Sequence, residues 1–405
     1  MKQLLIIIFI LIAGGAKGYT KDFDYSHIAP HPRLLLKEGE ERNIHIALQK
    51  STVLQAFHKR ILDYCDETLK EAPVKRIKEG KRLLGVSRIV LKRVFYLSYA
   101  YRMTGEKEYL RRAEKEMLAA ASFIDWNPSH FLDVSEMSMG LAIGYDWLFN
   151  ELLPDSRKKI RQAIVEKAIE ASKTKHASFY QSRTNWNQVC NGGLVCSALA
   201  IYEDEPEKTK EIINKALQTV PLALECYAPD GGYPEGFGYW SYGTSYQVML
   251  NDALESSLGH DAGLSDYPGF LQSAQYIQYM TAPTGDCFNF SDASPKAYGN
   301  IMMFWFAHKT KNPSLLWLEK KYLNDANLEF GEYLEERFLP CLLIFASRID
   351  LDEVISPKGN TWHSIGTTPV YIYRSGWNYK TDTYLGVKGG TASTSHAHMA
   401  VSYTH

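Results

Sequence analysis

The sequence predicts a mainly α protein in which helical hairpins stack into an incomplete ring, followed by the start of a β domain. Three observations support this fold class. Apolar residues recur with the 3.6-residue period of a helix over most of residues 40–345. Polar junctions about 50 residues apart divide that region into pairs of amphipathic helices. Beyond about residue 350, short segments rich in β-branched and aromatic residues replace the helical pattern.

The N-terminus has the pattern of a secretory signal peptide. Lys2 precedes an apolar run over 4–13, and small residues follow at 14–16 and at Gly18. This run is shorter than the roughly 20 apolar residues that span a bilayer, but it matches the apolar core of a signal. The alternative is a buried first helix or strand. We expect residues 1–18 to be a signal peptide, the protein to be periplasmic or secreted, and the chain to have no membrane span.

Charge and composition narrow the function classes. The 405 residues include 45 Lys and Arg against 46 Asp and Glu, a formal charge of -1. Without a basic excess, a dedicated nucleic-acid binder is not expected. The 26 Tyr and 8 Trp are the notable feature, because aromatic rings provide flat faces on which sugar rings stack.

The helical region shows its hairpins most clearly at 87–123, where two apolar stripes flank a polar turn at 103–106. Another junction lies at 150–156, where Pro154 and Asp155 are helix-start signals. Because one hairpin cannot bury its apolar face alone, hairpins at a regular period stack side by side. An ordinary helical bundle is the alternative. We assign residues 19–350 to the helical domain.

The final region is expected to begin a β domain over 351–405. Segments 368–374 and 383–388 have the composition of strands and are bounded by Gly and Asn. Two strands are only marginally stable without more sheet to pair with. We therefore expect this region to be the beginning of a truncated domain.

The six cysteines are scattered and form no Cys-x-x-Cys pair. A disulfide is possible in an oxidising compartment, but a chain of this size does not need one. We expect buried free thiols and no thiol nucleophile.

The densest group of aromatic residues lies at 229–246. Five glycines and two prolines in this segment predict a shaped loop leading into a helix after Ser241. Loops that carry aromatic residues on a rigid scaffold are typical of binding sites, and a tyrosine near a charge can transfer protons. The alternative is a loop whose rings plug one end of the core.

Two polar segments are further candidates for a site. Residues 183–193 contain four amide side chains before an apolar helix, and either an N-cap or polar packing between helices could explain part of that pattern. Residues 389–398 end in His396 and His398, which would point to the same face of a strand. Such a pair could bind a metal or divide into a base and a ligand. A solvent-exposed pair is the alternative.

Several of these segments together resemble the heparinase II/III-like polysaccharide lyases. The matching motifs occur in the same order as in that family and extend over nearly the whole chain beyond the signal: 31–35 (HPRLL), 139–150 (MGLAIGYDWLFN), 185–193 (NWNQVCNGG), 230–242 (DGGYPEGFGYWSY), 373–377 (YRSGW) and 395–399 (SHAHM). The resemblance implies an incomplete (α/α) toroid followed by an antiparallel β-sandwich, with the site between them. It also implies β-elimination on a uronic-acid-containing polysaccharide, either glycosaminoglycan-like or alginate-like.

The resemblance assigns roles to individual residues. Asn187, with Gln188, would donate to the uronate carboxylate as the C5 proton leaves, a kind of contact worth about 3 kcal/mol. Tyr242 is the first choice for the acid or base and Tyr239 the second, and His396 matches the family's catalytic histidine. His398 matches a ligand of a structural zinc in one branch. Further substrate contacts are expected from residues beside the motifs: Trp186, Arg183, Glu235, Trp240 and Arg374.

One departure affects the expected activity. Relatives continue past the His-Ala-His-Met motif through the sandwich, whereas this sequence ends at His405. The remaining zinc ligands would lie beyond that point, so the resemblance is to a truncated member and no cofactor is assigned with certainty. A catalytically inactive glycan-binding protein and a helical interaction scaffold are the alternatives to the lyase.

Overall fold

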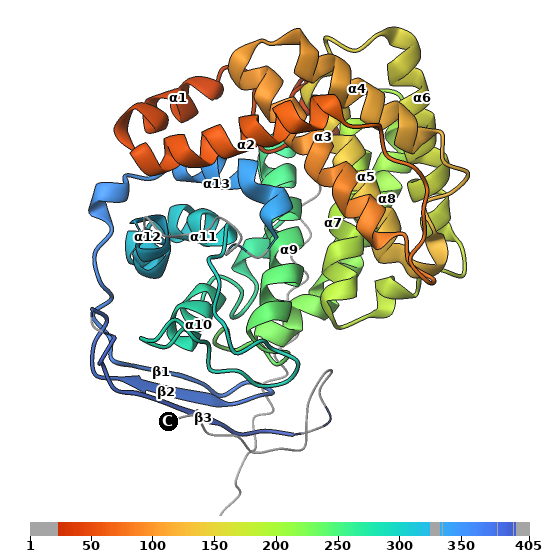
Figure 1. The fold of residues 1–405 in the computed structure, drawn as a ribbon. Helices are drawn as coiled ribbons and strands as arrows, with labels where there is room; N and C mark the ends of the chain where they lie inside the picture. Colours follow the sequence, from red (N-terminus) through yellow and green to blue (C-terminus); the bar gives the residue numbers. More distant parts are fainter. Residues whose placement is uncertain (1–22, 325–332, 334, 379, 392, 394–405) are drawn as a thin grey trace, which may run out of the picture.

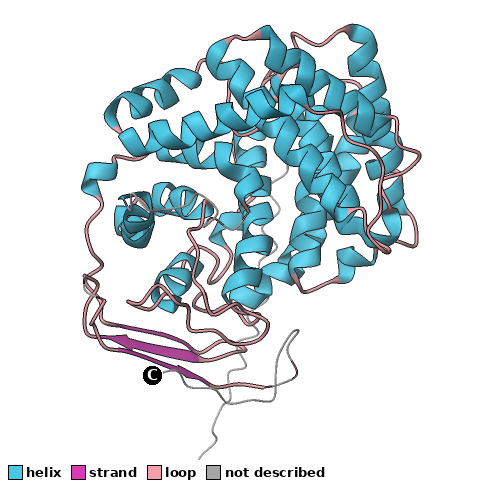
Figure 2. Ribbon diagram, in the orientation of Figure 1, coloured by secondary structure: helices cyan, strands magenta, loops and turns pink. Residues whose placement is uncertain are grey.

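A computed structural model describes residues 23–324, 333, 335–378, 380–391 and 393 of the chain. Its described part is mainly α-helical and ends in a small antiparallel sheet, so the predicted fold class is confirmed (Figures 1 and 2). The predicted signal peptide, His396 and His398 lie outside the described residues. The elements are α1 (Glu41–Lys50), α2 (Thr52–Lys70), α3 (Leu84–Thr104), α4 (Lys107–Ala121), α5 (Phe131–Trp147), α6 (Pro154–Ile164), α7 (Asn185–Ala200), α8 (Pro206–Leu224), α9 (Phe237–Leu258), α10 (Ser273–Met280), α11 (Met302–Thr310), α12 (Trp317–Asn324), α13 (Leu339–Ala346), β1 (Thr361–Ser364), β2 (Val370–Arg374) and β3 (Tyr384–Lys388).

Four helices, α3, α5, α7 and α9, form a continuous inner layer. Each packs on the next, and glycines occupy the contact points. A Cβ on Gly140 of α5 would lie 2.7 Å from the Leu91 Cα of α3, and one on Gly243 of α9 would lie 2.5 Å from the Gln188 Oε1 of α7. Since no Cβ fits at these distances, the helices approach almost backbone to backbone.

These four inner helices run in the same direction. Gly140 of α5 meets Leu91 of α3, and Gly144 meets Val94, so the contacts follow the same order along both helices. The same order holds between α5 and α7 and between α7 and α9. The N-terminal ends of the inner helices therefore gather at one end of the layer, which is the lower end of α9 in Figure 1.

Several of the remaining helices pack on the outside of this inner layer. Helix α4 packs on α3, α6 on α4 and α5, and α8 on α7 (Figure 1). Helix α13 contacts α11 as well as α1, α2 and α3. The incomplete (α/α) toroid expected from the sequence stays a prediction.

The sheet has the order β1-β2-β3, with both pairs antiparallel. The two predicted strands are present, and β1 is an additional strand of only four residues. Trp362 of β1 packs against Tyr276 and Tyr279 of α10, and the Tyr384 hydroxyl donates to the Tyr279 carbonyl over 3.0 Å. The inner face of the sheet is thus covered by the helical part.

Helix α9 begins earlier than the sequence predicted. The expected loop was to continue to Ser241, but the helix starts at Phe237, directly after Gly236 with a φ of 87°. The glycine-rich turn ends there, and the later Gly243 is retained inside the helix because α7 packs against it. The predicted loop boundary was therefore wrong, and Tyr239 and Tyr242 lie on the first two turns of a helix.

Two further expectations concern thiols and membranes. All six cysteines are free, and all except the half-buried Cys226 are buried, as predicted. Burial raises the pKa of the Cys190 thiol, which disfavours a thiolate there. Within the described residues, no helix combines the length and the apolar character needed to cross a membrane.

Candidate functional site

A buried carboxylate organises the N-terminal ends of the inner helices. We call Arg88, Glu136, Tyr242 and Arg337 the Glu136 cluster. Arg337 donates from Nε and a terminal nitrogen to the two Glu136 oxygens, each over 2.8 Å. Arg88 of α3 donates to Oε1 over 3.0 Å, and the Tyr242 hydroxyl of α9 donates to the same oxygen over 3.1 Å. One carboxylate on α5 thus joins α3, α9 and the segment before α13.

The electrostatics of this cluster keep the carboxylate charged and the phenol protonated. Burial acts to raise the pKa of Glu136, but Arg337 and Arg88 outweigh it, so that pKa lies below its usual range. Burial and the charge of Glu136 raise the pKa of Tyr242 well above 10, although both arginines act in the opposite direction. Tyr242 therefore holds its proton at neutral pH.

The ring of Tyr242 lies close to two guanidinium groups. Arg88 is 5.1 Å and Arg337 5.7 Å from its centroid, within the range of cation–π attraction. Arg88 keeps 40% of its side chain exposed, whereas Glu136 is fully buried. The cluster therefore presents positive charge toward solvent and keeps inside both its anion and the hydroxyl that donates to it.

The amide group on α7 lies beside this cluster but points inward. Asn187 is fully buried, and its amide nitrogen donates to the carbonyls of Ser182 and Thr219, each over 3.0 Å. Gln188 is also buried and donates to the Tyr227 hydroxyl over 2.9 Å. Substrate contact by either amide would require these bonds to break, and their assigned roles stay predictions.

The structure nevertheless brings the two predicted clusters together. A Cβ on Gly243, next to Tyr242, would lie 3.0 Å from the Asn185 Cβ at the start of α7. Asn187 and Tyr242 therefore lie on adjacent parallel helices at the same end of the inner layer, not on opposite sides of the molecule.

The other aromatic and acidic candidates of this region differ in exposure. Tyr239 is half-buried, and its pKa is raised by burial and by the charges of Asp292 and Glu235. Trp240 is fully buried against Phe306, so its ring belongs to the core. Glu235 is buried and accepts a hydrogen bond from the Tyr233 hydroxyl over 3.3 Å.

The structure also shows where the remaining predicted substrate contacts lie. Arg183 is two-thirds exposed and pairs with Glu225, and the half-buried Trp186 lies edge-on to His130, 5.0 Å between centroids. Arg374 is buried in β2, where it stacks 3.5 Å from the centroid of the Trp377 ring. Burial lowers the Arg374 pKa to about 10.

The predicted catalytic His396 and the predicted zinc ligand His398 lie outside the described residues. Among the residues that are described, no group of three or more His, Cys, Asp or Glu side chains is arranged to hold a metal ion. The zinc ligand and the catalytic histidine stay predictions.

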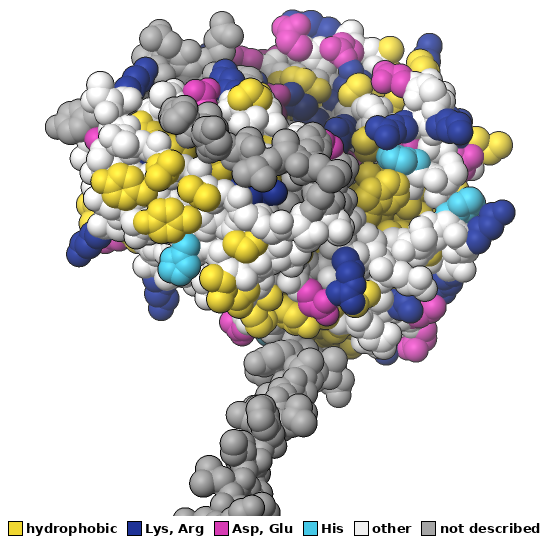
Figure 3. Space-filling view, turned by 90° about the horizontal axis from the view of Figure 1, so that it is seen from below, with side chains coloured by type: hydrophobic (Ala, Val, Ile, Leu, Met, Phe, Trp, Pro, Cys, Tyr) yellow, Lys and Arg dark blue, Asp and Glu magenta, His cyan; other side chains and the backbone are white. Residues whose placement is uncertain are grey.

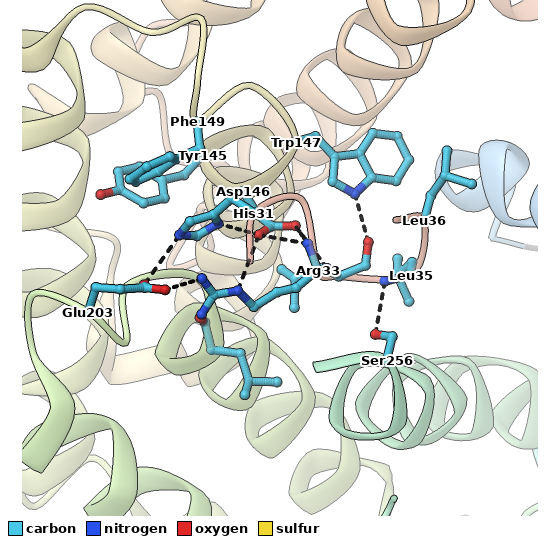
Figure 4. A network of polar contacts seen from close by, with 12 residues as sticks. His31, Arg33, Leu35, Leu36, Tyr145, Asp146, Trp147, Phe149, Glu203 and Ser256 are labelled. Carbon is cyan, nitrogen blue, oxygen red and sulfur yellow. Dashed lines mark hydrogen bonds and ion pairs between the residues drawn. The ribbon is translucent and has the colours of Figure 1, made fainter. Parts of the chain in front are cut away.

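A second polar network lies at the opposite end of α5 and joins two of the quoted motifs (Figure 4). We call His31, Arg33, Asp146 and Glu203 the Asp146 network. Asp146 accepts from His31 Nδ1 over 2.5 Å and from the backbone nitrogens of Arg33 and Leu34 over 2.9 and 2.8 Å. His31 Nε2 lies 3.3 Å from Glu203, which also pairs with Arg33. The 31–35 and 139–150 motifs therefore anchor the N-terminal segment to α5.

The comparisons with known proteins identify no family for this chain: no protein-family model matches it, and no curated protein matches it. The resemblance to the heparinase II/III-like lyases therefore depends on the quoted motifs alone.

Sequence reasoning missed the central residues of the site. Helix α5 is buried along its whole length, yet it carries three acids, Asp133, Glu136 and Asp146. A carboxylate in a buried helix needs a partner, and each of the three has one. That pattern could have pointed to Glu136, but its partners Arg88 and Arg337 are too distant in sequence to be found from spacing.

Two cavities among the described residues lie elsewhere. One, of about 440 Å³, is bounded mainly by α1, α2 and the segment after α13, and another, of about 400 Å³, lies at the C-terminal end of α9. Neither contains a predicted site residue.

The face seen from below in Figure 3 carries hydrophobic side chains with basic side chains and histidines beside them.

Proposed function

We propose that the protein is an exported polysaccharide lyase that cleaves a uronic-acid-containing polysaccharide by β-elimination. The observation that carries this proposal is the placement of Tyr242. Its hydroxyl is held on Glu136 and its ring lies near two guanidinium groups, at the end of the inner layer where the α7 amides begin. The family resemblance of the motifs supplies the reaction class.

The chemistry fits a tyrosine that keeps its proton. In β-elimination, the C5 proton leaves to a base, its electron pair forms the C4–C5 double bond, and the C4–O4 bond breaks. The departing O4 needs a proton, which a phenol with a raised pKa can donate. Arg88 would attract the acidic chain, because it is partly exposed and positively charged.

The decisive test is Tyr242→Phe. We expect it to reduce formation of the unsaturated uronate chromophore about 1000-fold with heparan sulfate or alginate, since the proton donor is lost. Tyr239→Phe tests the second-choice tyrosine on the preceding helical turn, and thermal unfolding checks that both variants fold. Full activity in both variants would remove tyrosine from the mechanism.

A catalytically inactive glycan-binding protein is the second candidate. The inward hydrogen bonds of Asn187 and Gln188 favour it, because they leave the predicted carboxylate donors occupied. Retention on an acidic polysaccharide column without any unsaturated product would support this alternative over the lyase.

A further inference from the structure

A histidine–aspartate pair stands at the start of α5, next to the proposed site. His130 Nδ1 lies 2.6 Å from the Asp133 Oδ1, and Asp133 is fully buried. A hydrogen bond from Nδ1–H to a carboxylate places the basic lone pair on the other ring nitrogen. His130 Nε2 makes no hydrogen bond to any described residue, and 17% of the side chain is exposed.

The aspartate is fixed by other contacts, so it can orient the ring. Its second oxygen, Oδ2, accepts from the backbone nitrogen of Leu83 and from the Asn127 amide nitrogen, each over 2.6 Å. Asn127 is itself buried and has a φ of 61°. Three donors thus hold Asp133 in place, and only His130 among them has a second ring nitrogen.

The pair lies at the same end of the inner layer as the Glu136 cluster. His130 precedes α5 and meets the Trp186 ring on the first turn of α7. Asn185, the neighbour of Trp186, lies against Gly243 next to Tyr242. Glu136, which holds the Tyr242 hydroxyl, follows His130 by less than two helical turns.

We propose that His130, oriented by Asp133, is the base that removes the C5 proton in the proposed lyase reaction. The assignment rests on the proposed function. His130 Nε2 takes the C5 proton, the C5–H electron pair becomes the C4–C5 double bond, and the C4–O4 bond breaks as Tyr242 protonates O4. Solvent then takes the proton from His130 and returns one to Tyr242, which restores both groups without an additional reactant.

Another histidine of this chain shows how a histidine with a structural role is enclosed. His31 is also bonded to a buried aspartate, but its second nitrogen lies 3.3 Å from Glu203 and only 5% of its side chain is exposed. His130 has the first contact without the second. Within the described part of the chain, the second nitrogen of His130 faces no carboxylate and its side chain is more exposed, which distinguishes a base from an anchor.

The experiment compares His130→Asn with His58→Gln in the full chain. Asparagine keeps a nitrogen near the position of Nδ1 for Asp133 but has no counterpart of Nε2. His58 is a half-buried, hydrogen-bonded histidine on α2 and serves as the control. With whichever of alginate or heparan sulfate the wild type converts, we expect kcat to fall at least about 100-fold in His130→Asn, with little change in KM or in thermal unfolding.

Chemical rescue separates a base from a positioning residue. Free imidazole should restore part of the activity of His130→Ala and none of that of Tyr242→Phe. Activity of His130→Asn within about threefold of wild type would overturn the assignment, as would a loss confined to KM or one that imidazole does not relieve. If the wild type is active and only Tyr242→Phe is impaired, the base assignment fails and the lyase stands. If the wild type produces no unsaturated uronate, the lyase fails and the assignment with it.

Discussion

The two ends of α5 carry the same kinds of side chain and use them differently. At the N-terminal end, Glu136 binds two arginines and a tyrosine, and Asp133 binds a histidine. At the C-terminal end, Asp146 binds a histidine and the backbone of an arginine, whose side chain pairs with Glu203. Composition alone would not separate a site from a structural anchor.

The two ends differ in how far their side chains are enclosed. In the Asp146 network, the aspartate accepts two backbone hydrogen bonds, and both His31 nitrogens face carboxylates. At the other end, His130 has one nitrogen without a described partner, and Arg88 keeps 40% of its side chain exposed. A partly exposed group can contact a ligand, whereas an enclosed one can only hold the chain.

The largest expected effect is on the free energy of unfolding, and it tests the Asp146 network as a structural anchor. Asp146→Ala removes the acceptor of two backbone nitrogens and the partner of His31, and it should lower the free energy of unfolding by about 5 kcal/mol. Denaturant unfolding measures the change. Activity per folded molecule should be unaltered, and a specific loss of kcat in the folded fraction would contradict the division between anchor and site.

Glu136→Gln should affect both stability and activity. The substitution leaves Arg337 and Arg88 without their shared charge and should cost about 3 kcal/mol, less than Asp146→Ala because Glu335 still pairs with Arg337. Since the charge of Glu136 raises the Tyr242 pKa, that pKa should fall in the variant. Ultraviolet titration of the phenol checks this, and an unchanged titration would show that Glu136 does not control Tyr242.

The pH dependence of the stability that the Asp146 network provides follows from His31. Burial acts to lower its pKa, but the hydrogen bonds to Asp146 and Glu203 outweigh burial, so the folded pKa lies above 6.5. The stabilisation is therefore fully present below pH 6.5 and lost as the pH rises through the folded value. The difference in unfolding free energy between wild type and His31→Gln should be about 1 kcal/mol larger at about pH 5.5 than at about pH 8.

An opposite slope, with the difference growing toward alkaline pH, would mean that His31 is neutral in the folded protein. At acidic pH the change in stability comes from Glu203. Burial acts to raise the pKa of Glu203, but His31 and Arg33 outweigh burial and lower that pKa to about 2. Its contribution is present above pH 4.5 and lost as the pH falls toward 2.

The smallest effect is expected for Arg183→Ala. The pair with Glu225 is more than half exposed on both sides, so stability should change by less than about 0.5 kcal/mol. As a predicted substrate contact, Arg183 should instead influence KM, which we expect to rise about threefold at low salt with kcat unchanged. Equal kinetics at low and high ionic strength would remove Arg183 from the binding surface.

The fold was predictable where the signal is local. The helical period identified the hairpins, and β-branched segments located β2 and β3. Strand β1 was missed because it has four residues, and the start of α9 was misplaced because glycines were read as helix breakers. Gly243 is a glycine because α7 packs closely against it, and the sequence around Gly243 alone does not reveal that contact.

The candidate site was predictable in part. Tyr242 and Trp186 were singled out, and they lie at the same end of the inner layer. Trp240 was expected to contact a sugar but is buried, because aromatic content does not tell which face of a helix a ring occupies. His130, Glu136 and Arg337 come from three separate segments and are united only by the fold.

The glycine contacts of the inner layer have a consequence for how a long glycan would be accommodated. Where helices meet with no Cβ between them, they have little room to slide or tilt. Adjustment to ligands of different width must then come from the connecting segments and the sheet. Variants selected for altered sugar preference should accumulate their changes there and leave the glycines of α5, α7 and α9 untouched.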